Sequence, residues 1–220
     1  MKIPTASTSA IADVLALKGR SGWLTPPLQP VVAARCPVVG EAVTMRIERR
    51  DVSAGGDAPD FTPMYDVLSG DHAGKVLVIA GAVDVGGAVW GEILAHSARQ
   101  AGFAAIALDG FVRDLGALHD LALPIYASGT AVVGPQGQAH VSAVNVDVVI
   151  NGVTVSPGDT IVLDDSGCVC LQSTISSDVL SAAALYERAE EEVLGALAAG
   201  ERITSAYKYK SSAVARLKGQ

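Results

Sequence analysis

Charged and aromatic side chains are scarce in this chain of 220 residues. Charged residues make up 18% of the sequence and aromatic residues 5%, whereas 50% of it is apolar. The formal charge is −7, so the chain lacks the clustered positive charge that binds nucleic-acid phosphates. The basic residues near its C-terminal end are better explained as a solvated helix face. The composition therefore excludes general nucleic-acid binding and predicts a well-filled core.

Disulfide and membrane signals are also missing. Three cysteines, Cys36, Cys168 and Cys170, cannot form an even disulfide framework. Cys168 and Cys170 would share one face of a strand, which indicates two buried thiols, with a soft-metal site as the alternative. The first residues lack the apolar segment of a signal peptide, and no window approaches 18 apolar residues. We therefore expect a cytoplasmic protein that makes no contact with a membrane.

Hydrophobic periodicity predicts a single α/β domain. We expect helices at 7–18, 64–68, 88–100, 114–120, 177–199 and 204–218, strands at 38–47, 75–80, 104–108 and 123–127, and an all-β region over 139–171. Segments 22–37 and 51–63 are rich in proline and glycine and should be irregular. Residues 75–108 form a strand, a helix and a second strand, which predicts a right-handed βαβ crossover. Residues 1–175 would form the core, and 176–220 a helical extension that packs on a neighbouring subunit.

A glycine-rich segment follows the first strand of this crossover. Gly86 and Gly87 lie in the turn, and Gly91 lies at the start of the following helix. The first N–H groups of a helix have no intrahelical partners and attract an anion, so a phosphate or carboxylate could bind here. The spacing matches neither nucleotide-binding glycine motif. The alternative is that these glycines only allow the helix to pack closely on the strand.

Arg113 and Asp114 follow the second strand of the crossover. Since ligands bind beyond the carboxyl ends of parallel strands, both segments should open on the same edge of the sheet. Arg113 offers a planar fork that matches a carboxylate, and Asp114 offers oxygen ligands that suit Mg²⁺ or Mn²⁺. An ordinary surface ion pair, or Asp114 as a helix N-cap, are the alternatives.

Several motifs together resemble a known family. W-G-E-I-L-A contains Glu92, and twenty residues separate Glu92 from the Arg113-Asp114 pair that ends D-G-F-V-R-D. S-A-I-A-D-V-L, V-V-G-E-A-V-T and V-S-P-G-D extend the likeness over most of the chain. With these motifs the chain resembles the RraA-like family. That family includes divalent-metal 4-hydroxy-4-methyl-2-oxoglutarate aldolases, which also decarboxylate oxaloacetate, and regulators of ribonuclease E activity.

The resemblance implies a fold and a site. The fold would be a swivelling β/β/α sandwich with an N-terminal helix and long C-terminal helices, assembled as a homotrimer or a dimer of trimers. Backbone N–H groups of Gly91, Glu92, Ile93 and Leu94 would hold the substrate carboxylate. Arg113 would bind the keto acid and stabilise enolate charge, and Asp114 would bind Mg²⁺ or Mn²⁺, partly through waters.

The resemblance also implies an acidic residue from the last helices of a neighbouring subunit. Glu190 is the best match for this further metal ligand, with Glu191 and Glu192 close in register. A solvated acidic face is the alternative. The sequence departs from the aldolases at Glu92, where they have Asp, and at Ala117, where they favour an acid.

The chemistry of the residues agrees with a metal enzyme. Cleaving a carbon–carbon bond beside a 2-keto group needs an electron sink, supplied by a lysine imine or a metal. Residues 81–114 contain no lysine, which favours the metal. We therefore expect a lyase that releases pyruvate from small 2-keto acids, such as 4-hydroxy-4-methyl-2-oxoglutarate and oxaloacetate, through a metal-stabilised enolate. The alternative, favoured by Ala117, is a non-catalytic regulator that binds a partner protein.

Overall fold

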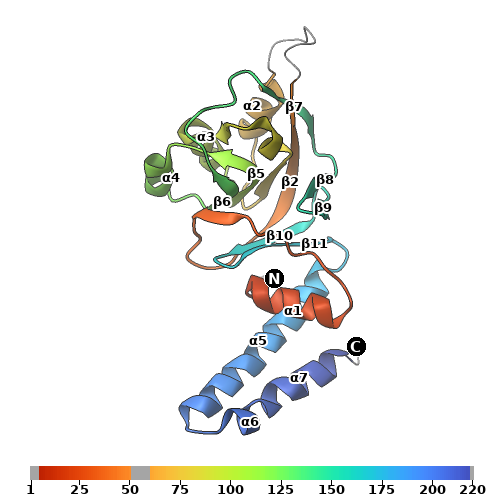
Figure 1. Cartoon of the computed structure of the whole chain (residues 1–220). Coiled ribbons are helices and arrows are strands. Elements are labelled where there is room, and N and C mark those ends of the chain that lie inside the picture. The colour runs from red at the N-terminus through yellow and green to blue at the C-terminus, as the bar shows by residue number, and fades with distance from the viewer. Residues whose placement is uncertain (1–4, 51–59, 219–220) are drawn as a thin grey trace.

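A computed structural model describes residues 5–50 and 60–218, which build an α/β fold around one mixed sheet (Figure 1). The sheet runs in the order β1-β6-β5-β3-β2-β10-β11, with β4 paired to β5 and β7 paired to β2. Its strands are β1 (Gln29–Val32), β2 (Val38–Arg49), β3 (Val76–Ala80), β4 (Ala88–Trp90), β5 (Ala105–Val112), β6 (Ile125–Thr130), β7 (Ala139–Val144), β10 (Thr160–Asp164) and β11 (Gly167–Leu171). A separate hairpin joins β8 (Val148–Ile150) to β9 (Val153–Val155).

The predicted βαβ crossover is confirmed at the centre of the sheet. β3 and β5 are parallel neighbours, in register from Val76 opposite Ala105 to Ile79 opposite Leu108, and α3 (Glu92–Gln100) lies between them in the chain. All five residues of β3 are buried. A continuous apolar strand of this kind needs cover on both faces of the sheet, and the structure supplies it.

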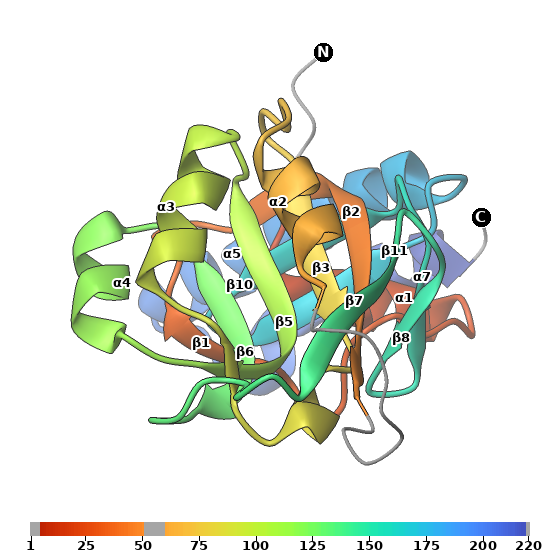
Figure 2. The same cartoon turned by 90° about the horizontal axis from the view of Figure 1, so that it is seen from above.

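Three helices cover one face of the parallel strands. α2 (Thr62–Leu68), α3 and α4 (Leu115–Leu121) pack there on a core that contains Met64, Ala95 and Leu118. In Figure 2 these helices lie on the near side, and α1 (Thr8–Leu17), α5 (Ser176–Ala198) and α7 (Lys208–Lys218) lie on the far side. The expected single α/β domain with layered sheets is thus confirmed.

The opposite face of the parallel strands packs against β10, β11 and the β8–β9 hairpin rather than directly against helices. On β11, Cys168 and Cys170 point into the core shared with β3 and β8, whereas Val169 and Leu171 point to α1 and α5. The two cysteines therefore share a face, as the alternation predicted. Burial raises the pKa of both thiols, that of Cys170 to about 12, as expected for inert core thiols.

The C-terminal helices form an arm that leaves the sheet and turns back on itself. α5 runs away from the core, and α6 (Ile203–Ala206) leads into α7, which returns beside α5 (Figure 1). Lys210 on α7 places its Nζ 2.6 Å from Oε1 of Glu190 and 4.7 Å from the ring centroid of Tyr186. The Tyr186 hydroxyl donates a hydrogen bond of 2.7 Å to Asp13 on α1. These contacts join α7, α5 and α1.

Several local predictions were wrong. Ala88–Trp90 is a strand, because these three buried residues pair with the end of β5, and the helix begins only at Glu92. β1 lies within the expected irregular segment 22–37 and pairs with β6. The all-β region expected over 139–171 is present, with β7, β10 and β11 joined to the main sheet through β2 or each other. In the expected loop 51–63, residues 51–59 lie outside the described residues and α2 begins at Thr62.

None of the helices within residues 5–50 and 60–218 combines the length and apolar character needed to cross a lipid bilayer.

Candidate active site

The two segments singled out from the sequence meet at one edge of the sheet. Gly91 follows β4, and Arg113 and Asp114 follow β5, which is the parallel neighbour of β4. The Arg113 N–H donates a hydrogen bond of 3.0 Å to the carbonyl oxygen of Trp90, so the pairing continues beyond the last residue of β5. The prediction that both segments open on the same edge is therefore met.

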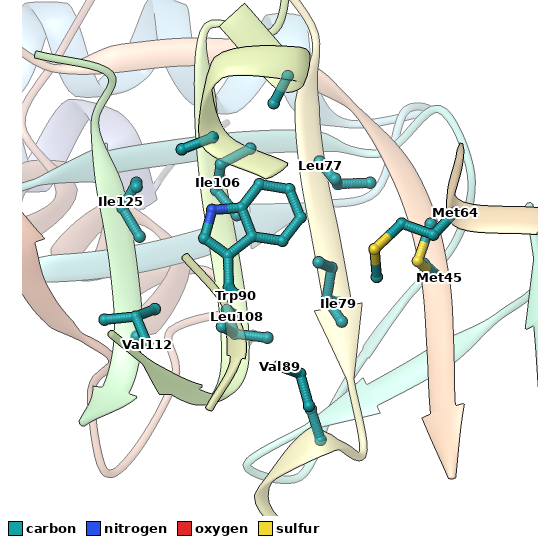
Figure 3. Packing of buried hydrophobic residues seen from close by; sticks show 14 of the residues in the cluster. Met45, Met64, Leu77, Ile79, Val89, Trp90, Ile106, Leu108, Val112 and Ile125 are labelled. Atoms are coloured by element: carbon teal, nitrogen blue, oxygen red, sulfur yellow. The ribbon is translucent and has the colours of Figure 1, made fainter. Parts of the chain in front are cut away.

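Trp90 fixes the position of the Gly91 backbone. Its side chain is 1% exposed and lies in the core beside Leu77, Ile106 and Leu108 (Figure 3). The indole Nε1 is buried and has no hydrogen-bond partner within the described part of the chain. The indole therefore contributes through packing, and this packing fixes Trp90, the residue that immediately precedes Gly91.

Gly91 lies against Asp114 so closely that no side chain fits between them. A Cβ built on Gly91 would lie 2.6 Å from Oδ2 of Asp114 and 3.2 Å from Cγ of Arg113. The same Oδ2 accepts a hydrogen bond of 3.3 Å from the Glu92 N–H and lies 3.6 Å from Nε of Arg113. One carboxylate, one guanidinium and the first turn of α3 thus form a single cluster.

The backbone of Asp114 is unusual. It adopts the left-handed conformation, with φ 64° and ψ 40°, which costs a residue with a side chain about 1 kcal/mol or more. Asp114 occupies the N-cap position of α4, but its side chain makes no capping hydrogen bond. The N-cap interpretation is thus right about the position of Asp114, but its carboxylate does not cap the helix. An ion pair with Arg113 is present, but both side chains are more than 40% exposed, so it adds little stability.

The cluster opens into a cavity of about 400 Å³. Gly91, Glu92, Arg113 and Asp114 supply its polar edge. The remaining lining is largely apolar and includes Phe61, Tyr65, Ile93, Leu94 and Pro135. Ile93 and Leu94 are among the residues that the sequence predicts here, through their backbone N–H groups, whereas no sequence motif indicates Phe61, Tyr65 or Pro135.

Another contact missed from the sequence comes from the loop after β6. A Cβ on Gly134 would lie 3.1 Å from Nη1 of Arg113, so this glycine leaves space for the guanidinium. β6 is parallel to β5, and neighbouring parallel strands end at a common edge of the sheet. The rule that predicts the meeting of the segments after β4 and β5 therefore predicts the loop after β6 as well.

The glycine turn has a different role from the predicted one. Gly86 and Gly87 lie between the 3-10 helix η2 (Ala82–Val85) and β4, and not at the start of α3. A Cβ on Gly87 would collide with the carbonyl oxygen of Gly134. The Ala88 N–H donates a hydrogen bond of 2.8 Å to the carbonyl oxygen of Val133. The turn therefore brings two loops together. The residue that caps α3 is Gly91, which supplies no side-chain partner for the first N–H groups of the helix.

Comparison with known proteins agrees with this arrangement. The sequence model of the RraA-like family, described as Aldolase/RraA, matches residues 8–170. The chain belongs to the RraA-like family.

Three similar proteins show the range of this family. A Halalkalibacterium halodurans protein named "Putative 4-hydroxy-4-methyl-2-oxoglutarate aldolase" is 30% identical over 179 residues, which cover 81% of this chain and 79% of that protein. Protein DlpA of Legionella pneumophila is 26% identical over 91% of this chain, which spans 32% of the length of DlpA. RraAS2 of Streptomyces coelicolor, described as an unusual member of the RNase ES inhibitor RraA protein family, is 25% identical. Its structure superposes with a TM-score of 0.74 over 86% of this chain and 91% of that one. The names of these relatives thus include both an aldolase and a member of an RNase inhibitor family.

The donor set of this RraA-like site suits a hard cation that keeps most of its water. No group of three His, Cys, Asp or Glu residues that could hold a metal occurs within residues 5–50 and 60–218. Asp114 offers one carboxylate, turned away from its own helix and half exposed in the cavity. Mg²⁺ is commonly held by one or two carboxylates, with waters and substrate oxygens completing the octahedron. Ala117 is partly buried on α4 and has no donor side chain.

The acidic residues of the arm lie apart from this cluster within one chain. Glu190 is engaged by Lys210, while Glu191 and Glu192 are exposed. Desolvation opposes the charged form of Lys210, but its hydrogen bonds to Glu190 and Tyr186 outweigh this and raise the pKa of the lysine. A contact of Glu190 with a metal in a neighbouring subunit remains a prediction.

Proposed function

We propose that the protein is a carbon–carbon lyase that uses Mg²⁺ or Mn²⁺ and releases pyruvate from small 2-keto acids, including 4-hydroxy-4-methyl-2-oxoglutarate and oxaloacetate. The observation that supports it most is the convergence of Arg113, Asp114 and the first turn of α3 on one open cavity. The strained backbone of Asp114 adds to this support. Such strain is typical of functional sites, and neither the helix cap nor the ion pair explains it.

Each group of the cluster has a definite part in this reaction. The N–H groups of Gly91, Glu92, Ile93 and Leu94 lie at the positive end of α3 and would bind the substrate C1 carboxylate. For this the Glu92 N–H would exchange its hydrogen bond to Asp114 for one to the substrate. Arg113 would donate hydrogen bonds to the 2-keto oxygen, on which negative charge develops as the C3–C4 bond breaks. Asp114 would hold the divalent cation, which when bound polarises the 2-keto group as a Lewis acid.

For oxaloacetate the balance of the reaction is simple. The C3–C4 bond breaks, C4 leaves as CO₂, and the electron pair of the bond passes to C3. The resulting enolate of pyruvate then takes up one proton. Because the cavity opens to solvent, water can supply that proton, and no second acid on the chain is required. The guanidinium of Arg113 stabilises the enolate oxygen until the proton arrives.

A non-catalytic regulator that binds a partner protein is the second candidate. The observation that favours it is Ala117, which leaves α4 without a donor at the position where the aldolases favour an acid. A regulator would show no turnover of 2-keto acids, whether or not a divalent cation is present.

The test is a coupled assay. The purified protein is mixed with Mg²⁺ or Mn²⁺ and with oxaloacetate or 4-hydroxy-4-methyl-2-oxoglutarate, and pyruvate is measured with lactate dehydrogenase and NADH. We expect release that EDTA suppresses, that Asp114→Ala abolishes, and that Arg113→Ala lowers at least a hundredfold. Asp120→Ala, a change of an exposed aspartate on α4, is the matched control and should keep full activity. Absence of release from both substrates with metal present would reject the lyase and leave the regulator.

We further propose a homotrimer or a dimer of trimers in which the helical arm contacts a neighbouring subunit. The exposure of Leu185, Leu194 and Ile203 on the arm supports this, because such side chains are commonly covered in an assembly. Light scattering of the purified protein should give the mass of three or six chains. A monomer at micromolar concentration would reject the assembly. It would also reject the prediction that Glu190 acts in a neighbouring site.

A further inference from the structure

The lining of the cavity beside the polar cluster is largely apolar, and part of it is exposed. We define the apolar wall as Phe61, Tyr65, Ile93, Leu94 and Pro135. Ile93 is 80% exposed and Tyr65 is 56% exposed, although both are large. At this exposure neither side chain contributes much to the stability of the fold, so packing does not explain why these residues lie beside the site. Apolar side chains that line a cavity around a few polar groups are the usual surroundings of a bound organic ligand.

The described residues that line the cavity supply one cation for substrate carboxylates. Among the described residues that line it, Arg113 is the only cation, and Glu92 and Asp114 are acidic. If a substrate carboxylate occupies the N–H groups of α3, a second carboxylate would face the apolar wall. It would find no cationic partner there, whereas an apolar group in the same place removes its surface from water.

Resting on the proposed function, we propose that the preferred substrate is a 4-hydroxy-2-keto acid with a single carboxylate and an apolar group, alkyl or aryl, on C4. The C1 carboxylate and the 2-keto oxygen bind at the polar cluster, and the C4 substituent packs against the apolar wall. This assigns Ile93 and Tyr65 as specificity-determining residues. The dicarboxylate 4-hydroxy-4-methyl-2-oxoglutarate would then be turned over more slowly than its apolar analogues.

The reaction on this substrate class needs no additional reagent. The 4-hydroxyl group loses its proton, the C3–C4 bond breaks, and C4 becomes the carbonyl carbon of an aldehyde. The electron pair of the broken bond passes to C3 and forms the enolate of pyruvate, which takes up one proton. The net reaction converts one hydroxy keto acid into pyruvate and one apolar aldehyde, with no change of oxidation state overall.

A substrate series measures the contribution of the apolar wall. The compounds are 4-hydroxy-2-oxopentanoate, the corresponding hexanoate and heptanoate, and 4-hydroxy-2-oxo-4-phenylbutanoate. We expect kcat/KM to rise by up to about fourfold for each methylene that the wall removes from water. The longer members should exceed 4-hydroxy-4-methyl-2-oxoglutarate by at least tenfold. Oxaloacetate is assayed in parallel as the test of the lyase itself.

A charge placed in the wall should reverse the preference. Ile93→Lys adds an ammonium group at a position that is 80% exposed, so we expect the variant to fold. The ratio of kcat/KM for the hexanoate to that for 4-hydroxy-4-methyl-2-oxoglutarate should fall at least thirtyfold. Val149→Lys places the same ammonium group on the exposed face of β8, away from the cavity lining, and should leave the ratio unaltered. Circular dichroism and thermal melting confirm that both variants are folded.

The outcomes separate this inference from the proposed function. If oxaloacetate is decarboxylated but 4-hydroxy-4-methyl-2-oxoglutarate is preferred over every apolar substrate, the inference is overturned and the lyase stands. If no substrate releases pyruvate, the lyase and the inference fail together. If the apolar series is preferred but folded Ile93→Lys keeps the original ratio, the apolar wall does not set specificity and the inference is again overturned.

Discussion

A single methyl group added at Gly91 should remove activity without unfolding the protein. In Gly91→Ala the new Cβ would lie 2.6 Å from Oδ2 of Asp114, whereas ordinary contacts begin near 3.4 Å. The carboxylate must therefore move by about 0.8 Å or rotate away from the first turn of α3. Gly91 has φ −164° and ψ −165°, an extended conformation that alanine adopts freely. The perturbation thus acts on the side chain of Asp114, and more weakly on that of Arg113, but not on the backbone.

The two effects have very different magnitudes. The Asp114 side chain is 43% exposed and can swing into solvent, so the free energy of unfolding should change by less than ~1 kcal/mol. That corresponds to a shift in melting temperature of about 2–4 °C at most for a chain of this length. Displacing a catalytic group by about 1 Å commonly costs on the order of a hundredfold in rate. We therefore expect kcat/KM for oxaloacetate to fall about a hundredfold.

The coupled pyruvate assay and a thermal melt test this prediction together. Gly116→Ala, two residues beyond Asp114 on α4, is the matched control because a Cβ there would meet nothing within 4 Å. It should keep full activity and a melting temperature equal to or above that of the wild type, since alanine favours a helix. Wild-type turnover in folded Gly91→Ala would refute the reasoning, because the carboxylate of Asp114 would then have no fixed position to lose.

Three further predictions concern the buried core. Trp90→Ala should lower the free energy of unfolding by about 3–5 kcal/mol in urea titrations, because it empties a site that is 1% exposed; a loss below about 1 kcal/mol would contradict its anchoring role. At pH 8, a thiol reagent should label one cysteine rapidly in the native protein, the exposed Cys36, and three in urea, because burial raises the pKa of Cys168 and Cys170. Since unfolded thiols ionise near pH 8.5, the stability that these two neutral thiols provide is complete below that pH and is lost as the pH rises toward 12. The urea midpoint should therefore fall above pH 8.5, and an unchanged midpoint up to pH 10 would show that the two thiols do not contribute.

Local sequence signals predicted the central crossover and the long helix well. The continuous apolar run at 75–80 and the glycine after Ala101 marked the first strand and the C-terminal end of the helix of the βαβ unit to within a few residues. The stripe over 177–199 matches α5 (Ser176–Ala198) closely. These elements are long and strongly periodic, so their local preference agrees with the tertiary structure.

The misassignment of Ala88–Trp90 shows what local signals miss. Alanine, valine and tryptophan directly before a helical pattern read as its first turn. In the structure they pair with Phe111 and Val112 on β5, about twenty residues away in the chain. A short buried strand gains its stability from such a distant partner and from its surroundings, which sequence periodicity does not contain.

The sequence by itself determined the residues of the candidate site, because the fork of Arg113, the carboxylate of Asp114 and the glycine before Glu92 are chemical facts of the chain. The likeness of the chain to the RraA-like family also followed from its sequence motifs. Only the tertiary structure decided that Asp114 turns toward Gly91 and away from its own helix, and that the apolar wall lines the same cavity. Those facts depend on strand pairing and on contacts between α2, α3 and two loops, and such contacts form only when the whole sheet has folded.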